Sequence, residues 1–215
     1  MNGTEVRSVR DVLRGVAAAR VSRLQEGALA DRSEAVATLA RLRRCDPAAV
    51  GTEPTVWAIT LGDLPAELTE YSSGRPNEPT AAERALHATL VLYAMHQQSQ
   101  GQGVNLSGVS LGRAVGQLAR ARAGGDEPDS SVMNRFHQVA LANDFEGRVY
   151  HLRGLVQLMR AENPPIPLDH GLLAVDLWQL ADKYQDSNKV LTRWGRDLHY
   201  RPKNANNSTQ SEETK

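Results

Sequence analysis

The segment TAAERALHATLVLY, residues 80–93, decides the fold class of this 215-residue chain. It opens with Thr80 and Glu83 at the spacing of a capping box, the pair of side chains that satisfies free N–H groups at a helix N-terminus. Leu86, Leu90 and Tyr93 follow at helical spacing and therefore share one face. The segment predicts a helix that begins near residue 80 and buries this face.

Helical spacing of apolar residues recurs along most of the chain, whereas no stretch alternates apolar and polar residues as a half-buried strand does. Apolar residues make up 40% of the chain and are mostly Ala, Leu and Val, a composition that favours helices over sheets. We predict an all-α protein of about eight or nine helices. Further helical runs are 33–44, 111–118, 152–159, 173–180 and 191–198.

Loops are predicted where Gly, Pro, Ser and Asn gather between these runs. The segment QSQGQGVN, residues 98–105, is the expected seam between two small helical bundles. We expect an N-terminal helical bundle over residues 1–100 and a C-terminal helical bundle with a basic face over residues 106–201. Residues 202–215 contain no apolar residue except one alanine, so we predict a disordered tail there.

Patterns of catalytic and metal-binding residues are missing from the sequence. The six histidines form no HExxH motif, and the single Cys45 excludes an internal disulfide and a cysteine-based zinc site. Neither a GxxxxGK[ST] loop nor a complete dinucleotide fingerprint occurs. We therefore predict a protein that is not an enzyme, with no catalytic residue, metal or cofactor. Without a signal-peptide core or a long apolar run, we expect a cytoplasmic protein with no membrane partner.

A local asymmetry of charge is the positive signal in a chain whose formal net charge is zero. Residues 107–125, 130–143 and 147–161 contain arginine but no acidic residue. Successive helices without acids can form a basic groove that follows a phosphate backbone. Arg43 and Arg44 form a second, smaller cluster near the N-terminus. The candidate nucleic-acid-binding residues of the three acid-free segments are Arg113, Arg120, Arg122, Arg135, Arg148, Arg153 and Arg160.

The same arginines have an ordinary interpretation, in which they are solvated or paired with acids from other helices. We expect Arg113 to be exposed on the first turn of its helix. Trp57, Trp178 and Trp194 lie in apolar contexts, so we expect them to anchor the core rather than to stack on bases. Without exposed aromatic or amide side chains at defined places, binding to the backbone without sequence preference fits better than readout of bases.

Three motifs in order resemble CasB, the small subunit of the type I-E CRISPR surveillance complex Cascade. They are SGVSLGRAV (107–115), NRFHQVALANDFEGRVYHLRGLVQLM (134–159) and LTRWGRDLHY (191–200). The segment LARLRR, residues 39–44, resembles the Leu-Arg-Arg element near the N-terminus of that family. The resemblance extends from about Arg41 to Tyr200, and the order of the motifs is more specific than any one of them.

The resemblance implies an α-helical, two-bundle protein without catalytic activity. Two copies of the CasB subunit stack head to tail along the inner belly of Cascade. There they contact the backbone subunits, which hold the guide CRISPR RNA, and the large subunit. Their basic surface stabilises the R-loop, the structure in which target DNA pairs with the guide and the non-target strand is displaced. We therefore expect the partners to be these Cascade subunits, the guide RNA, both DNA strands and a second copy of this chain.

The site residues carry over by position. Gly154 stands where the family has the second arginine of its LRR element, so that contact is lost or supplied by Arg148 or Arg160. The residues that match the family's arginines are Arg113 in SLGR, Arg135 before Phe136, Arg153 at the first position of LRR, and the pair Arg43 and Arg44.

Three other functions remain open from the residues alone. A stand-alone helical regulator would read bases with exposed polar residues on a recognition helix. An unfamiliar enzyme would need a catalytic constellation in a polar pocket. A pure scaffold would pair its arginines internally.

Overall fold

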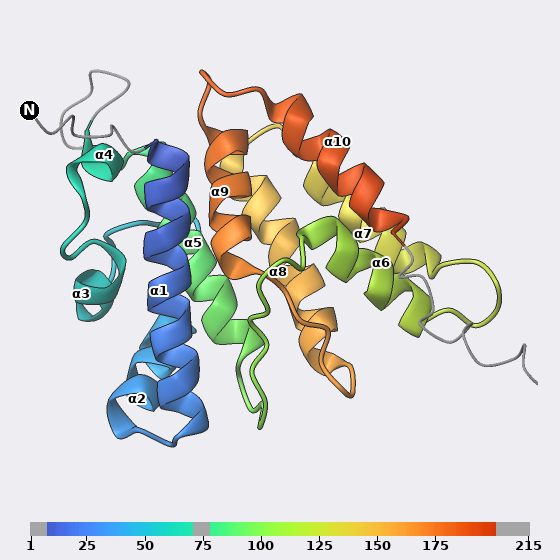
Figure 1. Ribbon diagram of the computed structural model, residues 1–215, viewed down its shortest axis with the longest axis horizontal. Helices are drawn as coiled ribbons and strands as arrows, with labels where there is room; N and C mark the ends of the chain where they lie inside the picture. Colours follow the sequence, from blue (N-terminus) through green and yellow to red (C-terminus); the bar gives the residue numbers. More distant parts are fainter. Residues whose placement is uncertain (1–7, 71–77, 201–215) are drawn as a thin grey trace, which may run out of the picture.

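The computed structural model describes residues 8–70 and 78–200, and over these ranges the protein is built from helices without a strand (Figure 1). The only strand-like feature there is an isolated parallel bridge between Asn105 and Leu168. The helices are α1 (Val9–Leu29), α2 (Ser33–Leu42), the 3-10 helix η1 (Pro54–Val56), α3 (Trp57–Thr60), α4 (Ala66–Thr69), α5 (Ala81–His96), α6 (Leu111–Ala121), α7 (Ser130–Leu141), α8 (Phe145–Ala161), α9 (His170–Ala181) and α10 (Ser187–Leu198).

The all-α prediction is confirmed. The expected number of helices was eight or nine, and the additional ones are short: α3 and α4 have four residues each, too few for an apolar period to show. The predicted disordered tail lies outside the described residues. No helix in the described ranges is long and apolar enough to cross a membrane.

Helix α5 is the central helix of the fold. The predicted capping box is present: the backbone N–H of Glu83 donates to Thr80 Oγ1 at 3.1 Å, and that of Thr80 donates to Glu83 Oε2 at 2.7 Å. All residues from Ala85 to His96 are buried, as expected for a helix that is covered on every side. Helices α1, α2, α8 and α9 pack around it.

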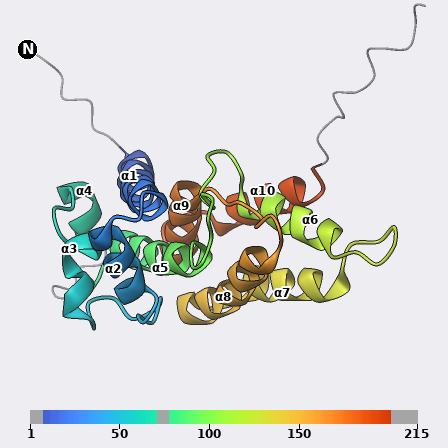
Figure 2. The same ribbon diagram turned by 90° about the horizontal axis from the view of Figure 1, so that it is seen from below.

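The other helices extend the core on one side of α5. Helices α7 and α8 pack against each other as a pair, and α6 packs against α10. Figure 2 shows α2, α8 and α7 along one side of the molecule, opposite α1, α9 and α10. Helix α9 packs against α1 and α5, although it follows the 98–105 loop in the chain. The division into residues 1–100 and 106–201 stays a prediction about folding units, and in space α9 joins the N-terminal helices.

Helices α6 and α10 approach so closely that their backbones touch. A Cβ atom on Gly112 would lie 2.2 Å from the carbonyl oxygen of Trp194, and one on Gly116 would lie 2.3 Å from that of Leu198. Both glycines face α10 because they are one helical turn apart. The hydroxyl of Ser110, the N-cap of α6, also donates to Asp197 Oδ2 at 2.5 Å. The SLGRAVG segment is therefore the packing surface that positions α10.

Two of the three tryptophans anchor the core as predicted. Trp194 is 1% exposed and Trp178 is 8% exposed, whereas Trp57 is 46% exposed. The prediction is wrong for Trp57 because it begins the short helix α3 at the edge of the fold, where its indole N–H donates to the carbonyl oxygen of Gly51 at 2.9 Å.

Candidate nucleic-acid interface

Arginines that are far apart in the sequence come close enough in the structure to interact electrostatically. Arg43 and Arg44 follow the end of α2, and Arg160 lies in the last turn of α8. Burial lowers the pKa of Arg43, and the positive charges of Arg160 and Arg44 lower it further. None of the three arginines has an ion pair with an acid of the described residues. The three guanidinium groups therefore form a cluster of like charge, which we call the Arg43 cluster.

The loop at 98–105 orients Arg160. The Nη1 group of Arg160 donates to Gln98 Oε1 at 2.6 Å, and Gln100 Nε2 donates to the Arg160 carbonyl oxygen at 3.0 Å. A neutral amide fixes the guanidinium without cancelling its charge. Sequence reasoning did not identify Gln98, because its partner lies on a distant helix.

The segment that follows Arg44 lies against α8 beside Arg153. Residues 46–48 and Arg153 line the same cavity, whose volume is about 360 Å³. Arg153 is exposed and has no ion pair within the described part of the chain. Arg153 therefore lies beside the segment that follows Arg43 and Arg44 in the chain.

Arg135 occupies the space next to Gly154, the position at which the sequence departs from the LRR element. Its Nη1 atom lies 3.4 Å from the point where a Cβ atom of Gly154 would be. Arg135 is exposed on α7 and, within residues 8–70 and 78–200, has no acidic partner. The sequence left two alternatives, a lost contact or one supplied by Arg148 or Arg160; the guanidinium beside this position is that of Arg135.

Arg148 points into the protein. It is 8% exposed, and its guanidinium donates to the carbonyl oxygens of Val139, Ala140 and Ala142 at 2.7, 3.3 and 2.5 Å. These carbonyls are at the C-terminal end of α7, where a helix has no internal donors for them. Burial lowers the pKa of Arg148, and the nearby charge of Asp144 acts in the opposite direction. Arg148 therefore holds the end of α7 against α8.

Arg120 and Arg122 also serve internal contacts. The Arg120 guanidinium donates to the carbonyl oxygens of Leu198 and Tyr200 at the end of α10, each at 3.5 Å. Arg122 Nε donates to Glu162 Oε1 at 2.6 Å in an ion pair that joins the end of α6 to the residue after α8. Both residues tie the C-terminal helices together.

Arg113 differs from its predicted exposure. It is half-buried, and its guanidinium carbon lies 4.1 Å from the centre of the Tyr200 ring, in the geometry of a cation–π contact. Its Nε atom is buried without a hydrogen-bond partner among the described residues. The close packing of α6 on α10 turns this side chain along the protein surface toward Tyr200.

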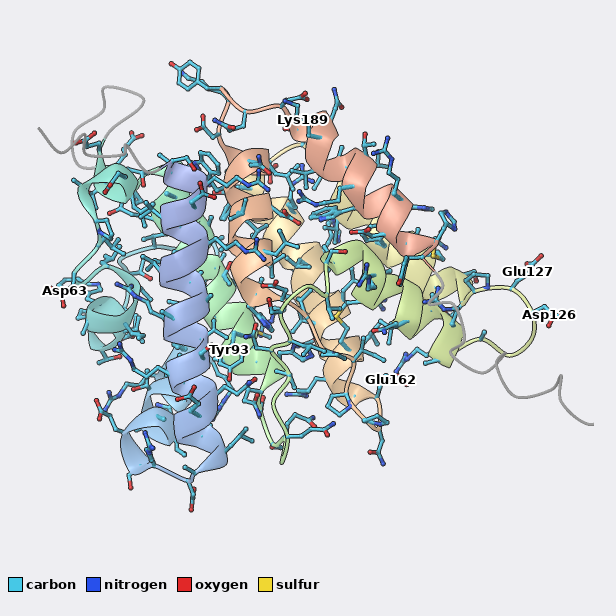
Figure 3. All side chains as sticks on the ribbon, in the orientation of Figure 1. Asp63, Tyr93, Asp126, Glu127, Glu162 and Lys189 are labelled. Atoms are coloured by element: carbon cyan, nitrogen blue, oxygen red, sulfur yellow. The ribbon has the colours of Figure 1, made fainter. Side chains whose placement is uncertain are left out.

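The predicted arginines thus divide by their surroundings. We call open those whose side chains are at least partly exposed and whose guanidinium groups have no ion pair, ring contact or hydrogen bond to backbone among the described residues; they come from the ends and outer faces of α2, α7 and α8. These helices lie along the same side of the protein in Figure 2. Figure 3 places Asp126 and Glu127 at the tip of the α6–α7 loop, away from α2 and α8. We call the open set the arginine surface; it consists of Arg43, Arg44, Arg135, Arg153 and Arg160.

Two buried histidines link α5 to α9. His96 Nδ1 lies 3.4 Å from His170 Nε2, and His170 Nδ1 lies 3.1 Å from Asn105 Oδ1. Burial lowers the pKa of His96 to about 4, and it lowers that of His170 as well. Both rings are therefore neutral and act as core residues. In the described part of the chain, no group of His, Cys, Asp and Glu could hold a metal ion.

Comparisons with known proteins agree with the motifs. The family model of CRISPR-associated protein Cse2 matches residues 38–199. The crystal structure of CasB from Thermobifida fusca is similar, with 34% identity and a TM-score of 0.70 over 88% of this chain and 98% of that chain. No curated protein matches the chain. The chain therefore belongs to the CRISPR-associated protein Cse2 family, the family of the CasB small subunit of Cascade that its motifs resemble.

Proposed function

We propose that this chain is the non-catalytic small subunit of a type I-E Cascade complex, and that its arginine surface binds nucleic-acid backbones without sequence preference. The observation that supports this is the accumulation of guanidinium groups from three helices with no carboxylate in ion-pair distance among the described residues. Gathering like charges opposes folding, and a polyanion relieves that repulsion.

The expected ligands are the target strand and the displaced non-target strand of the R-loop. Forming an R-loop exchanges a DNA duplex for an RNA–DNA duplex of similar stability, so a few phosphate contacts can shift the balance. The guide RNA, the other Cascade subunits and a second copy of this chain are the proposed partners that hold the surface in place. An ordered array of weak contacts then acts at high effective concentration.

The test uses the assembled complex and a double variant, Arg44→Ala with Arg153→Ala. Each lost contact to a single strand should reduce the slope of log affinity against log salt by about 0.7. The double variant should assemble normally and lose about twice that slope. Its loss of affinity relative to the wild type should be larger for intact duplex target than for a target that is already open. The change is neutral to folding because both side chains are exposed.

The matched control is Arg10→Ala with Arg196→Ala, two exposed arginines on α1 and α10. These helices lie on the side of the molecule opposite α2, α7 and α8 (Figure 2). The control should bind target like the wild type. If both double variants lose the same affinity, only net charge matters and the arginine surface is not the site. Wild-type affinity and salt dependence in the Arg44/Arg153 variant would refute the proposal directly.

A further inference from the structure

Tyr150 is an exposed aromatic residue within the arginine surface. On α8, 74% of it is accessible, and the adjacent His151 ring contacts it edge-on with centroids 5.4 Å apart. An exposed apolar side chain alone is common on protein surfaces. The chemistry around it decides whether it has a role.

Arginines border Tyr150 on the next turn of the same helix face. Arg153 and Gly154 follow it by three and four residues, the spacing of side-chain neighbours on a helix. The space over Gly154 is occupied by the guanidinium of Arg135. Tyr150 and Arg153 also line the cavity of about 360 Å³ between α8 and residues 46–48. An aromatic ring thus stands next to two exposed guanidinium groups at the edge of a cavity.

Two carboxylates line the same cavity, and the surrounding arginines outnumber them. Glu146 is paired with Arg84 at 2.7 Å, which cancels its charge. Asp46 lies two residues after the exposed Arg44, and its Oδ1 atom accepts from the backbone N–H of Ala48 at 2.9 Å, so it is opposed by the unpaired Arg153 and Arg135. The electrostatic environment of Tyr150 is therefore positive.

We propose that Tyr150 is a stacking platform for one unpaired base of a single strand, with Arg153 and Arg135 contacting the neighbouring phosphates. This inference rests on the proposed function and adds a base-contacting residue to a surface that otherwise contacts backbone. A ring beside guanidinium groups matches the two parts of a nucleotide, a flat base and an anionic phosphate. An apolar protein surface would instead leave Arg153 and Arg135 buried without partners, which is costly. Bases in a duplex are already stacked, so the ligand is single-stranded.

The test uses the full chain with Tyr150→Ala and Tyr150→Phe, and it measures fluorescence anisotropy of labelled oligothymidine and of an abasic oligomer of equal length. Removal of a stacking aromatic should weaken oligothymidine binding about 5- to 150-fold. Tyr150→Phe retains the ring and should bind like the wild type. With the abasic oligomer, all three proteins should bind equally. The control Leu141→Ala removes an apolar side chain of 77% exposure on α7 and should change neither affinity.

The Arg44→Ala/Arg153→Ala variant in the same assay separates this inference from the proposed function. If that variant loses affinity and Tyr150→Ala does not, the backbone surface stands and the stacking platform is refuted. If neither variant loses affinity for either oligomer, the proposed function fails as well. Normal oligothymidine binding by Tyr150→Ala, together with weaker assembly into Cascade, would assign Tyr150 to a protein contact and overturn the inference.

Discussion

Replacing Gly112 by alanine should loosen the α6–α10 contact. The new Cβ would lie 2.2 Å from the carbonyl oxygen of Trp194 and 2.9 Å from both the carbonyl carbon and the Cα atom of that residue. All three are backbone atoms, so no side chain can rotate away. A comfortable carbon–oxygen contact is about 3.3 Å, so the helices must separate by about 1 Å.

The free energy of unfolding reflects two opposing effects. Overpacking of this kind costs about 3 kcal/mol, near the upper end for core positions because only backbone can move. Alanine regains about 1 kcal/mol through its greater helix propensity. The variant should therefore be about 2 kcal/mol less stable, and the melting temperature should fall by about 4–8 °C.

The assay is thermal and chemical unfolding followed by circular dichroism. The matched control is Gly195→Ala on α10, where a Cβ would have no atom within 4 Å. That change should raise the free energy of unfolding by up to about 1 kcal/mol through helix propensity alone. If Gly112→Ala is as stable as the wild type, or is stabilised like the control, then the backbone contact does not hold α10 and the reasoning is refuted.

Two further predictions concern buried groups. Arg148→Met should lower the free energy of unfolding by about 2–4 kcal/mol in denaturant titrations, because carbonyl oxygens at the end of α7 lose their donors. The control Arg153→Met should change the free energy of unfolding by less than about 0.5 kcal/mol. Equal effects of the two substitutions would contradict the assigned roles. The pKa of His96 is about 4 in the folded protein and about 6.5 when unfolded, so the unfolded state binds more protons as the pH falls below 6.5. Between pH 7 and pH 5 the wild type should therefore lose about 2 kcal/mol more stability than His96→Gln, and parallel pH profiles of the two proteins would show that His96 does not titrate this way.

The helices could be predicted from the sequence because their signals are local. The Thr80–Glu83 capping box and the apolar spacing after it depend on neighbours within two turns, and α5 formed as expected. The short α3 and α4 carry no such period. Helix α9 packs against α1 and α5, which are distant in the sequence. The apolar periodicity of a helix predicts that one face is buried but not which helix covers it.

The candidate site could be predicted only as a set of arginines. An acid-free segment gives Arg148 and Arg153 the same signal, although one points inward to the end of α7 and the other outward. The electrostatic interaction of Arg43 with Arg160 depends on how α2 and α8 pack around α5. The sequence does not predict the exposure of Tyr150, because periodicity alone does not show which face of α8 stays uncovered. The spacing of Gly112 and Gly116, one turn apart, is a signal from which the close packing of α6 could have been found.

The meeting of Arg43 with Arg160 makes the arginine surface a property of the tertiary fold rather than of either end of the chain. A fragment that contains only α6 to α10 would present part of the surface, without the guanidinium groups that follow α2. In the free protein the like charges of these groups repel one another, and dissolved salt should screen that repulsion. A bound phosphate chain that spans the cluster would replace the repulsion by attraction to a common partner. The nucleic acid would then act as an electrostatic cross-link between two distant parts of the chain and raise the stability of the whole protein by linkage.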